Sequence, residues 1–288
     1  MKTWLKKRLD RLQVKFFHLR NNFFWLLFRP WYYFFKRVIC EGAPKLQPDN
    51  DAIAFYAQNA GRVAAVTGMF ADARDKLIFE KIIRFRQTYA KCDYPPCERK
   101  PQYFHVFQFG NDEAYIDCGA YMGDTLDEFI KNCPRYKHIA AFEPENANFQ
   151  KLQARYAGKR DVTLLNIGAY DKEGTLFIKG RDAWVSVATD GRDGAAAIRV
   201  NTIDNLGFEK VTFIKMDIEG AELNALKGAE KTILRDKPKL AICIYHSNED
   251  TLHIAEYIHH LVPEYRFRVR QYNCYPYIDE TVLYAHIP

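Results

Sequence analysis

From residue 114 onward, short apolar runs alternate with segments in which apolar residues recur at helical spacing. Seven runs are typical of buried strands: Ala114–Cys118, His138–Phe142, Val162–Asn166, Val211–Met216, Leu240–Tyr245, Arg266–Arg270 and Val282–His286. Four intervening segments are predicted helices: Thr125–Asn132, Ala147–Tyr156, Ala221–Leu234 and Glu249–Leu261. Because strands that alternate with helices form a parallel sheet with helices on both faces, the pattern predicts an α/β domain over residues 111–288.

The alternation is broken at two places. A Gly- and Asp-rich insert, Asp171–Ala197, separates the third and fourth strands and is predicted to be a β excursion with a loop. The last two strands are joined only by Gln271–Thr281, which is too short for a crossover helix. We therefore expect these two strands to pair antiparallel at the end of the sheet.

Two further regions precede the domain. Residues 41–110 are expected to be mainly helical, with Asp51–Tyr56 and Asp72–Tyr89 at helical spacing. Residues 1–40 form a separate segment in which leucines and phenylalanines recur every three or four positions, as on one face of an amphipathic helix. Its longest apolar run, Phe23–Phe28, is far below the roughly 18 residues of a membrane-spanning helix.

The positive charge of the chain is concentrated in that first segment. The whole chain has 42 basic and 36 acidic residues, whereas residues 1–40 have ten basic residues and one acid. The remainder is thus slightly acidic, which argues against a nucleic-acid partner. A basic helix rich in Trp and Phe can lie on an anionic membrane, or it can pack on the domain or on a partner. The sequence leaves these alternatives open.

The cysteines favour a reduced, cytoplasmic compartment, because their number is odd and their spacing irregular. Seven are present, and no secretory apolar segment with a cleavage site precedes them. Cys92 and Cys97 lack a second Cys or His pair at matching spacing, so we expect free thiols there. No metal site is expected from the cysteines.

The first predicted strand runs into a turn that indicates a nucleotide site. Gly119 and Gly123 form a G-x-x-x-G pattern, with Asp117 two residues before the first glycine. A dinucleotide site uses G-x-G-x-x-G, with pyrophosphate at the helix N-terminus. An acid at this position instead suits a cationic donor such as S-adenosylmethionine, whose ammonium Asp117 could pair directly or through water.

An acid at the end of the second strand supports that interpretation. Glu143 lies 20 residues after Gly123, where a carboxylate can accept both hydrogen bonds from a ribose diol. The alternative is a carboxylate that caps the following helix. The glycine turn at the right distance favours ribose binding.

Candidate catalytic residues follow the fourth and fifth strands. Asp217 and Glu219 lie directly after the fourth strand, and His246 follows the fifth, at the edge where open α/β sheets bind ligands. A hydroxyl acceptor must lose a proton during methyl transfer, and a neutral His near its ordinary pKa or a carboxylate can take it. The alternatives are helix caps and a structural His. Asp217 and His246 alone are too few for a metal site, so none is expected.

Taken together, these motifs resemble the FkbM family of S-adenosylmethionine-dependent methyltransferases. The matching stretches are YIDCGAYMGDT at 115–125, AFEPENAN at 141–148, NTIDNL at 201–206, FIKMDIEGAE at 213–222, LKGA at 226–229, PKLAICIYH at 238–246 and ETVLYA at 280–285. The resemblance covers about residues 100–286 and implies a Rossmann-like class I methyltransferase fold with seven strands. It also implies O-methylation of a sugar, a glycolipid precursor or another small hydroxylated metabolite.

The resemblance also assigns binding roles in the donor site. It implies that Ala120 and Thr125 belong to the donor site with Asp117, Gly119, Gly123 and Glu143. It further places Asn166 and Ala169, at the end of the third strand, near the adenine.

Three other functions compete with this one. A nicotinamide oxidoreductase should have a third glycine in the first turn, where Met122 and Thr125 stand instead. An amino-group or nucleic-acid methyltransferase often has an Asn/Asp-Pro-Pro-Tyr/Phe segment, and Asp217–Gly220 does not match it. A non-catalytic membrane-associated scaffold would explain residues 1–40, but it has no need of Asp117, Gly119 and Glu143 together.

Overall fold

The computed structural model describes residues 47–159, 161–181, 184–188 and 196–288 of the chain. The predicted amphipathic segment, residues 1–40, lies outside the described residues, so its helix stays a prediction. Within the described ranges, no helix combines the length and the apolar character that crossing a membrane requires.

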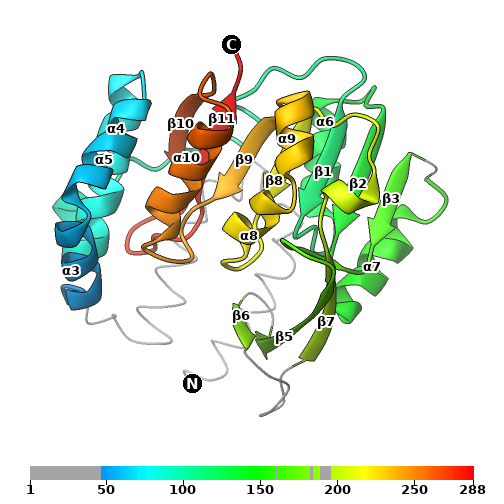
Figure 1. Ribbon diagram of the computed structural model, residues 1–288, viewed down its shortest axis with the longest axis horizontal. Helices are drawn as coiled ribbons and strands as arrows, with labels where there is room; N and C mark the ends of the chain where they lie inside the picture. The colour runs from blue at the N-terminus through cyan, green and yellow to red at the C-terminus, as the bar shows by residue number, and fades with distance from the viewer. Residues whose placement is uncertain (1–46, 160, 182–183, 189–195) are drawn as a thin grey trace, which may run out of the picture.

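Seven strands form the main sheet, in the order β10-β11-β9-β8-β1-β2-β3 (Figure 1). Their bounds are β1 Ala114–Cys118, β2 His138–Phe142, β3 Val162–Leu165, β8 Phe213–Met216, β9 Lys239–Cys243, β10 Arg266–Gln271 and β11 Thr281–His286. Six of these strands run in the same direction, whereas β11 runs antiparallel to both of its neighbours, β9 and β10. The predicted sheet with its antiparallel hairpin is confirmed.

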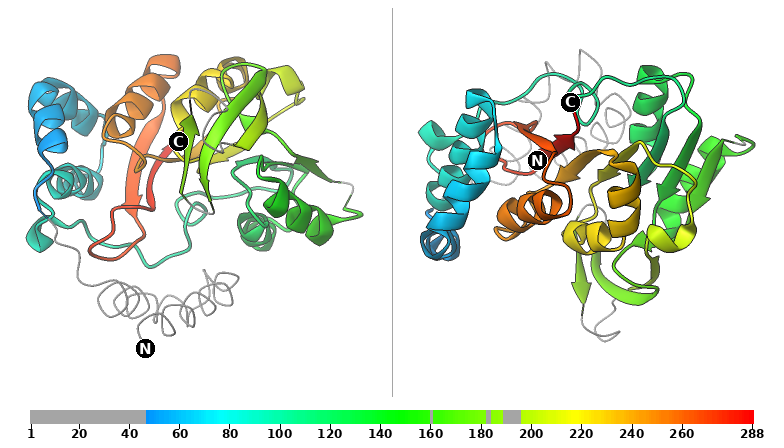
Figure 2. Two further views of the ribbon diagram at one scale, coloured as in Figure 1. Left: turned by 90° about the horizontal axis from the view of Figure 1, so that it is seen from below. Right: turned by 45° about the horizontal axis from the view of Figure 1, so that its top comes forward.

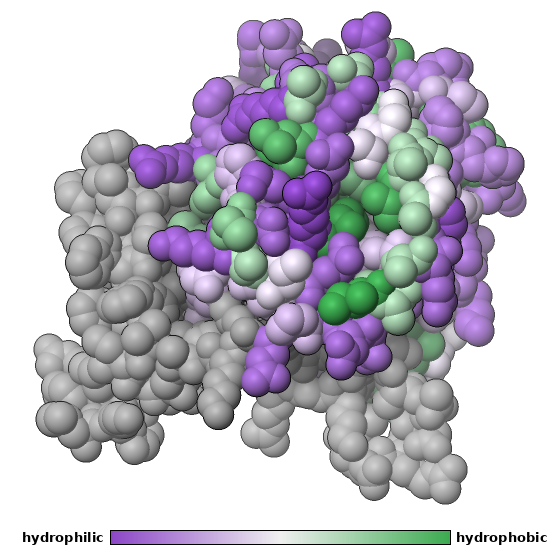
Figure 3. Space-filling model, turned by 90° about the vertical axis from the view of Figure 1, so that its left-hand side faces the viewer, coloured by the Kyte–Doolittle hydropathy of each residue, from purple (hydrophilic) through white to green (hydrophobic). Residues whose placement is uncertain are grey.

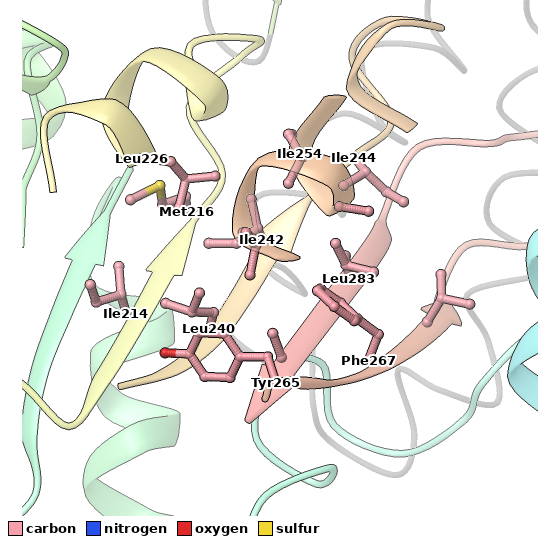
Figure 4. Packing of buried hydrophobic residues seen from close by; sticks show 14 of the residues in the cluster. Ile214, Met216, Leu226, Leu240, Ile242, Ile244, Ile254, Tyr265, Phe267 and Leu283 are labelled. Atoms are coloured by element: carbon pink, nitrogen blue, oxygen red, sulfur yellow. The ribbon is translucent and has the colours of Figure 1, made fainter. Parts of the chain in front are cut away.

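The sheet is buried on both faces, which explains why its strands are almost continuously apolar. Ile116 and Cys118 of β1 belong to one hydrophobic cluster, and Tyr115 belongs to a second cluster on the other face. Figure 4 shows the first cluster, in which β8, β9 and β11 pack against α8 and α10. The second cluster is strongly aromatic: Phe104 packs edge-on against Tyr115, and the ring of Phe129 is tilted against it.

Five helices connect the strands and cover the sheet. They are α6 Asp124–Asn132, α7 Asn146–Tyr156, α8 Glu222–Lys227, α9 Glu230–Asp236 and α10 Asp250–Leu261. The prediction of one continuous helix over 221–234 is wrong, because α8 and α9 are separate helices with Gly228 between them. A Cβ at Gly228 would lie 1.9 Å from the carbonyl oxygen of Tyr170, so only glycine allows this close approach.

Three helices form a layer at the β10 end of the sheet (Figures 1 and 2). They are α3 Asn50–Gln58, α4 Ala60–Met69 and α5 Ala73–Thr88. α5 packs on β10 and buries Ile78, Phe79 and Ile82 in the first cluster, and α4 contacts α10. Figure 3 shows that this end of the molecule is mostly hydrophilic outside, with scattered apolar side chains. After α5, residues 94–113 run mainly in turns.

The insert after β3 forms a second, smaller sheet in the order β4-β7-β5-β6. Its strands are β4 Gly168–Ala169, β5 Gly174–Arg181, β6 Trp184–Ala188 and β7 Ala196–Asn201. Figure 1 shows this sheet beyond the carboxyl ends of the parallel strands. The predicted β excursion therefore lies at the edge where the candidate site residues gather.

Candidate active site

The turn between β1 and α6 requires glycine at two positions. Gly119 and Gly123 have φ angles of +82° and +88°, in the left-handed region that other residues rarely adopt. A Cβ at Gly119 would lie 2.0 Å from the carbonyl oxygen of Asp217, so the β1 turn and the segment after β8 are in direct contact. The amides of Gly119 and Ala120 both donate to the carbonyl of Phe142, which ties the turn to β2.

Glu143 follows β2 beside this turn and is oriented by two backbone donors. Its Oε2 accepts from the amide of Tyr121 at 2.8 Å, and its Oε1 accepts from the amide of Glu145 at 2.9 Å. The residue is 6% exposed. Burial raises the pKa of Glu143 to about 7, although the two hydrogen bonds act to lower it. Each oxygen keeps a lone pair for a further donor.

Asp117 contacts groups of the chain itself. The carboxylate is fully buried, the hydroxyl of Thr125 donates to its Oδ2, and Nζ of Lys215 lies 3.0 Å from its Oδ1. Because none of its surface is exposed, direct contact with the ammonium of a donor would require the groups around Asp117 to move. If Asp117 acts instead by holding the glycine turn in position, none of its partners has to move.

Lys215 is a site residue that the sequence reasoning missed. Its side chain is 2% exposed, and its ammonium donates to the carbonyl of Gly119 at 2.8 Å and lies over the ring of Tyr103. Burial alone lowers the pKa of Lys215, but the carboxylates of Asp117 and Asp217 outweigh burial and raise it above its usual value. A lysine inside the apolar run of β8 was the signal that could have found it.

The two residues predicted near the adenine lie in different surroundings. Asn166 directly follows β3, and its side-chain amide donates to the carbonyl of Glu143 at 2.9 Å. Ala169 is buried in β4 of the smaller sheet, where it pairs with Asn201. Asn166 is thus part of the Glu143 corner.

The three predicted catalytic residues come together after β8 and β9, and a fourth joins them. His246 Nε2 lies 3.7 Å from Asp217 Oδ1 and 3.5 Å from Glu219 Oε2. His246 Nδ1 lies 3.2 Å from Oε1 of Glu222, an acid at the start of α8 that the sequence reasoning did not select. Glu222 is fully buried, whereas the side chain of Glu219 is 34% exposed. Burial raises the pKa of Glu219.

The expectation of an ordinary pKa for His246 is wrong. Burial alone lowers the pKa of His246, but the carboxylates of Glu222, Glu219 and Asp217 together raise it to about 11. With these neighbours alone the imidazole is a cation at neutral pH, and a cation cannot accept a proton. The carboxylates are the groups of the cluster that remain available as a base.

Two tyrosines and an arginine, also missed by the sequence reasoning, hold this cluster in place. The hydroxyls of Tyr103 and Tyr245 donate to the two oxygens of Asp217 at 2.9 and 2.8 Å. Arg86 of α5 donates to the carbonyl of Tyr245 at 2.5 Å and to the side chain of Asn248. α5 and the segment with Tyr103 therefore support the site from outside the sheet.

Comparison with known proteins agrees with the geometry. Residues 117–269 match the methyltransferase FkbM domain, which is more than half of the chain. The chain belongs to the FkbM methyltransferase family. A solved FkbM methyltransferase from Methylobacillus flagellatus is similar at 29% identity over 81% of this chain, with a TM-score of 0.69. This chain spans 60% of that protein's length. No curated protein matches the chain.

Two solved structures are similar at lower identity. An rRNA methylase from Streptococcus thermophilus is 17% identical over 63% of this chain and 90% of that chain, with a TM-score of 0.39. The fibrillarin of Aeropyrum pernix, solved with bound S-adenosyl-L-methionine, is 11% identical over 62% of this chain and 68% of that chain, with a TM-score of 0.38.

We predict that removing the charge of Lys215 strongly destabilises the protein. Lys215→Met leaves Asp117 buried without its cation, which typically costs about 3–5 kcal/mol. Urea unfolding at neutral pH measures the loss. The double variant Lys215→Met/Asp117→Asn should recover part of it, because no unpaired charge remains. Lys137→Met, which breaks an exposed pair with Glu209, is the control and should change stability by less than about 1 kcal/mol. A similar small change in Lys215→Met would contradict the prediction.

Proposed function

We propose that this chain binds S-adenosylmethionine at the β1–β2 edge and transfers its methyl group to a hydroxyl of a small acceptor. The observation that carries the proposal is Glu143, a buried carboxylate oriented by two amides directly beside the glycine turn. Such a carboxylate suits a ribose diol, since each oxygen can accept one hydroxyl hydrogen bond. Asp117, Gly119, Ala120, Gly123 and Thr125 shape the same corner, and Asn166 and Ala169 are proposed to border the adenine.

The acceptor is proposed to lie between this corner and the cluster of Asp217, Glu219 and His246. The contact of Gly119 with Asp217 brings the two regions together at one sheet edge. Glu219 is the most exposed carboxylate near His246, so it is proposed as the group that takes the acceptor's proton. The acceptor oxygen then bonds to the methyl carbon as its bond to sulfur breaks, leaving S-adenosylhomocysteine and a protonated Glu219.

The acceptor class is a sugar, a glycolipid precursor or another small hydroxylated metabolite, in the cytoplasm. The resemblance of the motifs to FkbM enzymes supports a small hydroxylated acceptor. The net acidic charge of residues 41–288 supports a partner other than nucleic acid. Residues 1–40, with their concentrated positive charge, are proposed to make peripheral contact with an anionic membrane.

Transfer of a labelled methyl group to a panel of sugars, nucleotide sugars and glycolipid precursors tests the reaction. Once an acceptor is found, Glu219→Gln should lower turnover by about 10²–10⁴-fold, because general-base assistance is lost. Asp217→Asn should also lower turnover, because it removes a charge that holds His246 beside Glu219. Donor affinity, measured by calorimetry, should stay near that of the wild type. Glu209→Gln, at an exposed acid before β8, is the matched control. Full turnover in both site variants would remove these carboxylates from the chemistry.

Donor affinity is expected to depend on pH through Glu143. As the pH falls through about 7, Glu143 takes up a proton and loses the charge that favours both ribose hydroxyls. S-adenosylhomocysteine should therefore bind about tenfold more weakly at pH 6 than at pH 8, whereas Glu143→Gln should bind weakly at both. Calorimetry over this range makes the measurement. An identical pH profile in wild type and Glu143→Gln would show that Glu143 does not bind the ribose.

Membrane contact is tested with anionic vesicles. Replacing Lys6, Lys7 and Arg8 by Glu in the full chain should weaken binding to vesicles, and wild-type binding should fall as salt rises. The same reversal at Lys131, Lys151 and Lys172, all exposed, is the control. Equal binding of both variants, or no wild-type binding at low salt, would refute a membrane role for residues 1–40.

A further inference from the structure

The acidic cluster contains three groups that can act together as metal ligands. One ligand atom from each of Asp217, Glu222 and His246 can be chosen so that all three lie within 4.8 Å of one another. Ligand atoms about 2.1 Å from a common ion lie roughly 3–4.2 Å apart, so small side-chain adjustments bring the three onto one ion. The third ligand, Glu222, was not among the residues selected from the sequence.

Three buried polar atoms of this cluster have no hydrogen-bond partner among the described residues. In the described part of the chain, Glu222 Oε2 and both ring nitrogens of His246 are buried without a hydrogen-bond partner. Glu222 is fully buried, and the side chain of His246 is only 10% exposed. Buried polar atoms are normally satisfied, and a carboxylate oxygen and an imidazole nitrogen are satisfied equally well by a cation.

The ligands are also held in position by outer contacts. Tyr103 and Tyr245 donate one hydrogen bond to each oxygen of Asp217. The amide of Ile218 donates to Glu222 Oε1 at 2.7 Å. Hydrogen bonds of this kind fix the orientation of ligating side chains in metal sites.

The negative charge of the cluster is larger than one imidazolium can neutralise, which favours a divalent cation. Asp217, Glu219 and Glu222 all lie within 4 Å of His246, so three carboxylates share a single ring. A protonated His246 leaves this group with two negative charges when the acids are ionised. A divalent ion bound by a neutral His246 leaves one, in a site with little water to screen it.

We infer that Asp217, Glu222 and His246 form a binding site for a divalent transition-metal ion of the Mn²⁺ or Zn²⁺ class. One imidazole and two carboxylates suit these ions better than Mg²⁺, which prefers oxygen ligands alone. The side chain of Glu219 is 34% exposed, so the cluster is accessible from that side to a further ligand such as an acceptor hydroxyl. That last role rests on the proposed function, whereas binding of the ion does not.

Titration of the chelator-treated full chain with Mn²⁺, followed by electron paramagnetic resonance, tests the site. We expect one Mn²⁺ per chain and its displacement by Zn²⁺. Glu222→Gln, which keeps the acceptor for the Ile218 amide, and His246→Gln should each weaken Mn²⁺ binding by at least about tenfold. Glu209→Gln, which removes an exposed acid elsewhere, should leave binding unchanged.

A crystal soaked in Mn²⁺ gives a readout that needs no variant. An anomalous peak between Asp217, Glu222 and His246 supports the site. Absence of the peak, absence of saturable binding of both ions, or equal affinity in wild type and both folded variants overturns it. Both metal experiments are done without donor or acceptor, so they test the metal site separately from the reaction. A chain that binds Mn²⁺ but transfers no methyl group refutes the proposed reaction alone. A chain that transfers a methyl group but binds no Mn²⁺ refutes the metal site alone.

Discussion

The buried pair of Lys215 and Asp117 is the interaction on which the functional edge of the sheet depends. The two residues are register partners on the adjacent parallel strands β8 and β1. Their side chains meet at 3.0 Å with almost no exposure to solvent. Because a buried charge is tolerated only with a partner, each residue fixes the other. Lys215 also donates to the carbonyl of Gly119, so the same ammonium holds the start of the glycine turn.

This pair separates two acidic regions with different electrostatic surroundings. Beside β2, the burial of Glu143 dominates and raises its pKa to about 7, so its charge changes near neutral pH. After β8 and β9, several carboxylates surround one imidazole, and their combined field reverses the effect of burial on His246. The sheet brings the two regions within reach of each other, because parallel strands end at one edge.

The strands could be predicted from sequence because burial on both faces makes them continuously apolar. β1 and β2 begin and end at the predicted residues, and the short connection before β11 required an antiparallel hairpin. α4 was not predicted, since it buries only Val66 fully and carries two glycines that weaken its pattern. The break between α8 and α9 depends on the approach of the Tyr170 carbonyl, which is a tertiary contact and leaves no local pattern.

Only the site residues that lie at the ends of strands could be predicted from the sequence. Asp117, Glu143, Asp217 and His246 follow or end strands, and the topology brings them to one edge. Lys215 is marked in the sequence only as a lysine inside an apolar strand. Glu222 and Tyr103 act through contacts between different elements, so spacing could not select them. The ordinary pKa expected for His246 failed for the same reason, because the strongest of the charges that raise it comes from α8.

The contact of α5 with the segment after β9 has a consequence for how members of this family can be recombined. Arg86 bonds to Tyr245 and Asn248, and Tyr56 of α3 also donates to Asn248. The helical layer and the loop that carries His246 thus share polar contacts that must match. A chimaera that combined this layer with the sheet of another methyltransferase would inherit only one half of each contact. In such a chimaera, residues 245–248 should therefore be taken from the same protein as α3 and α5.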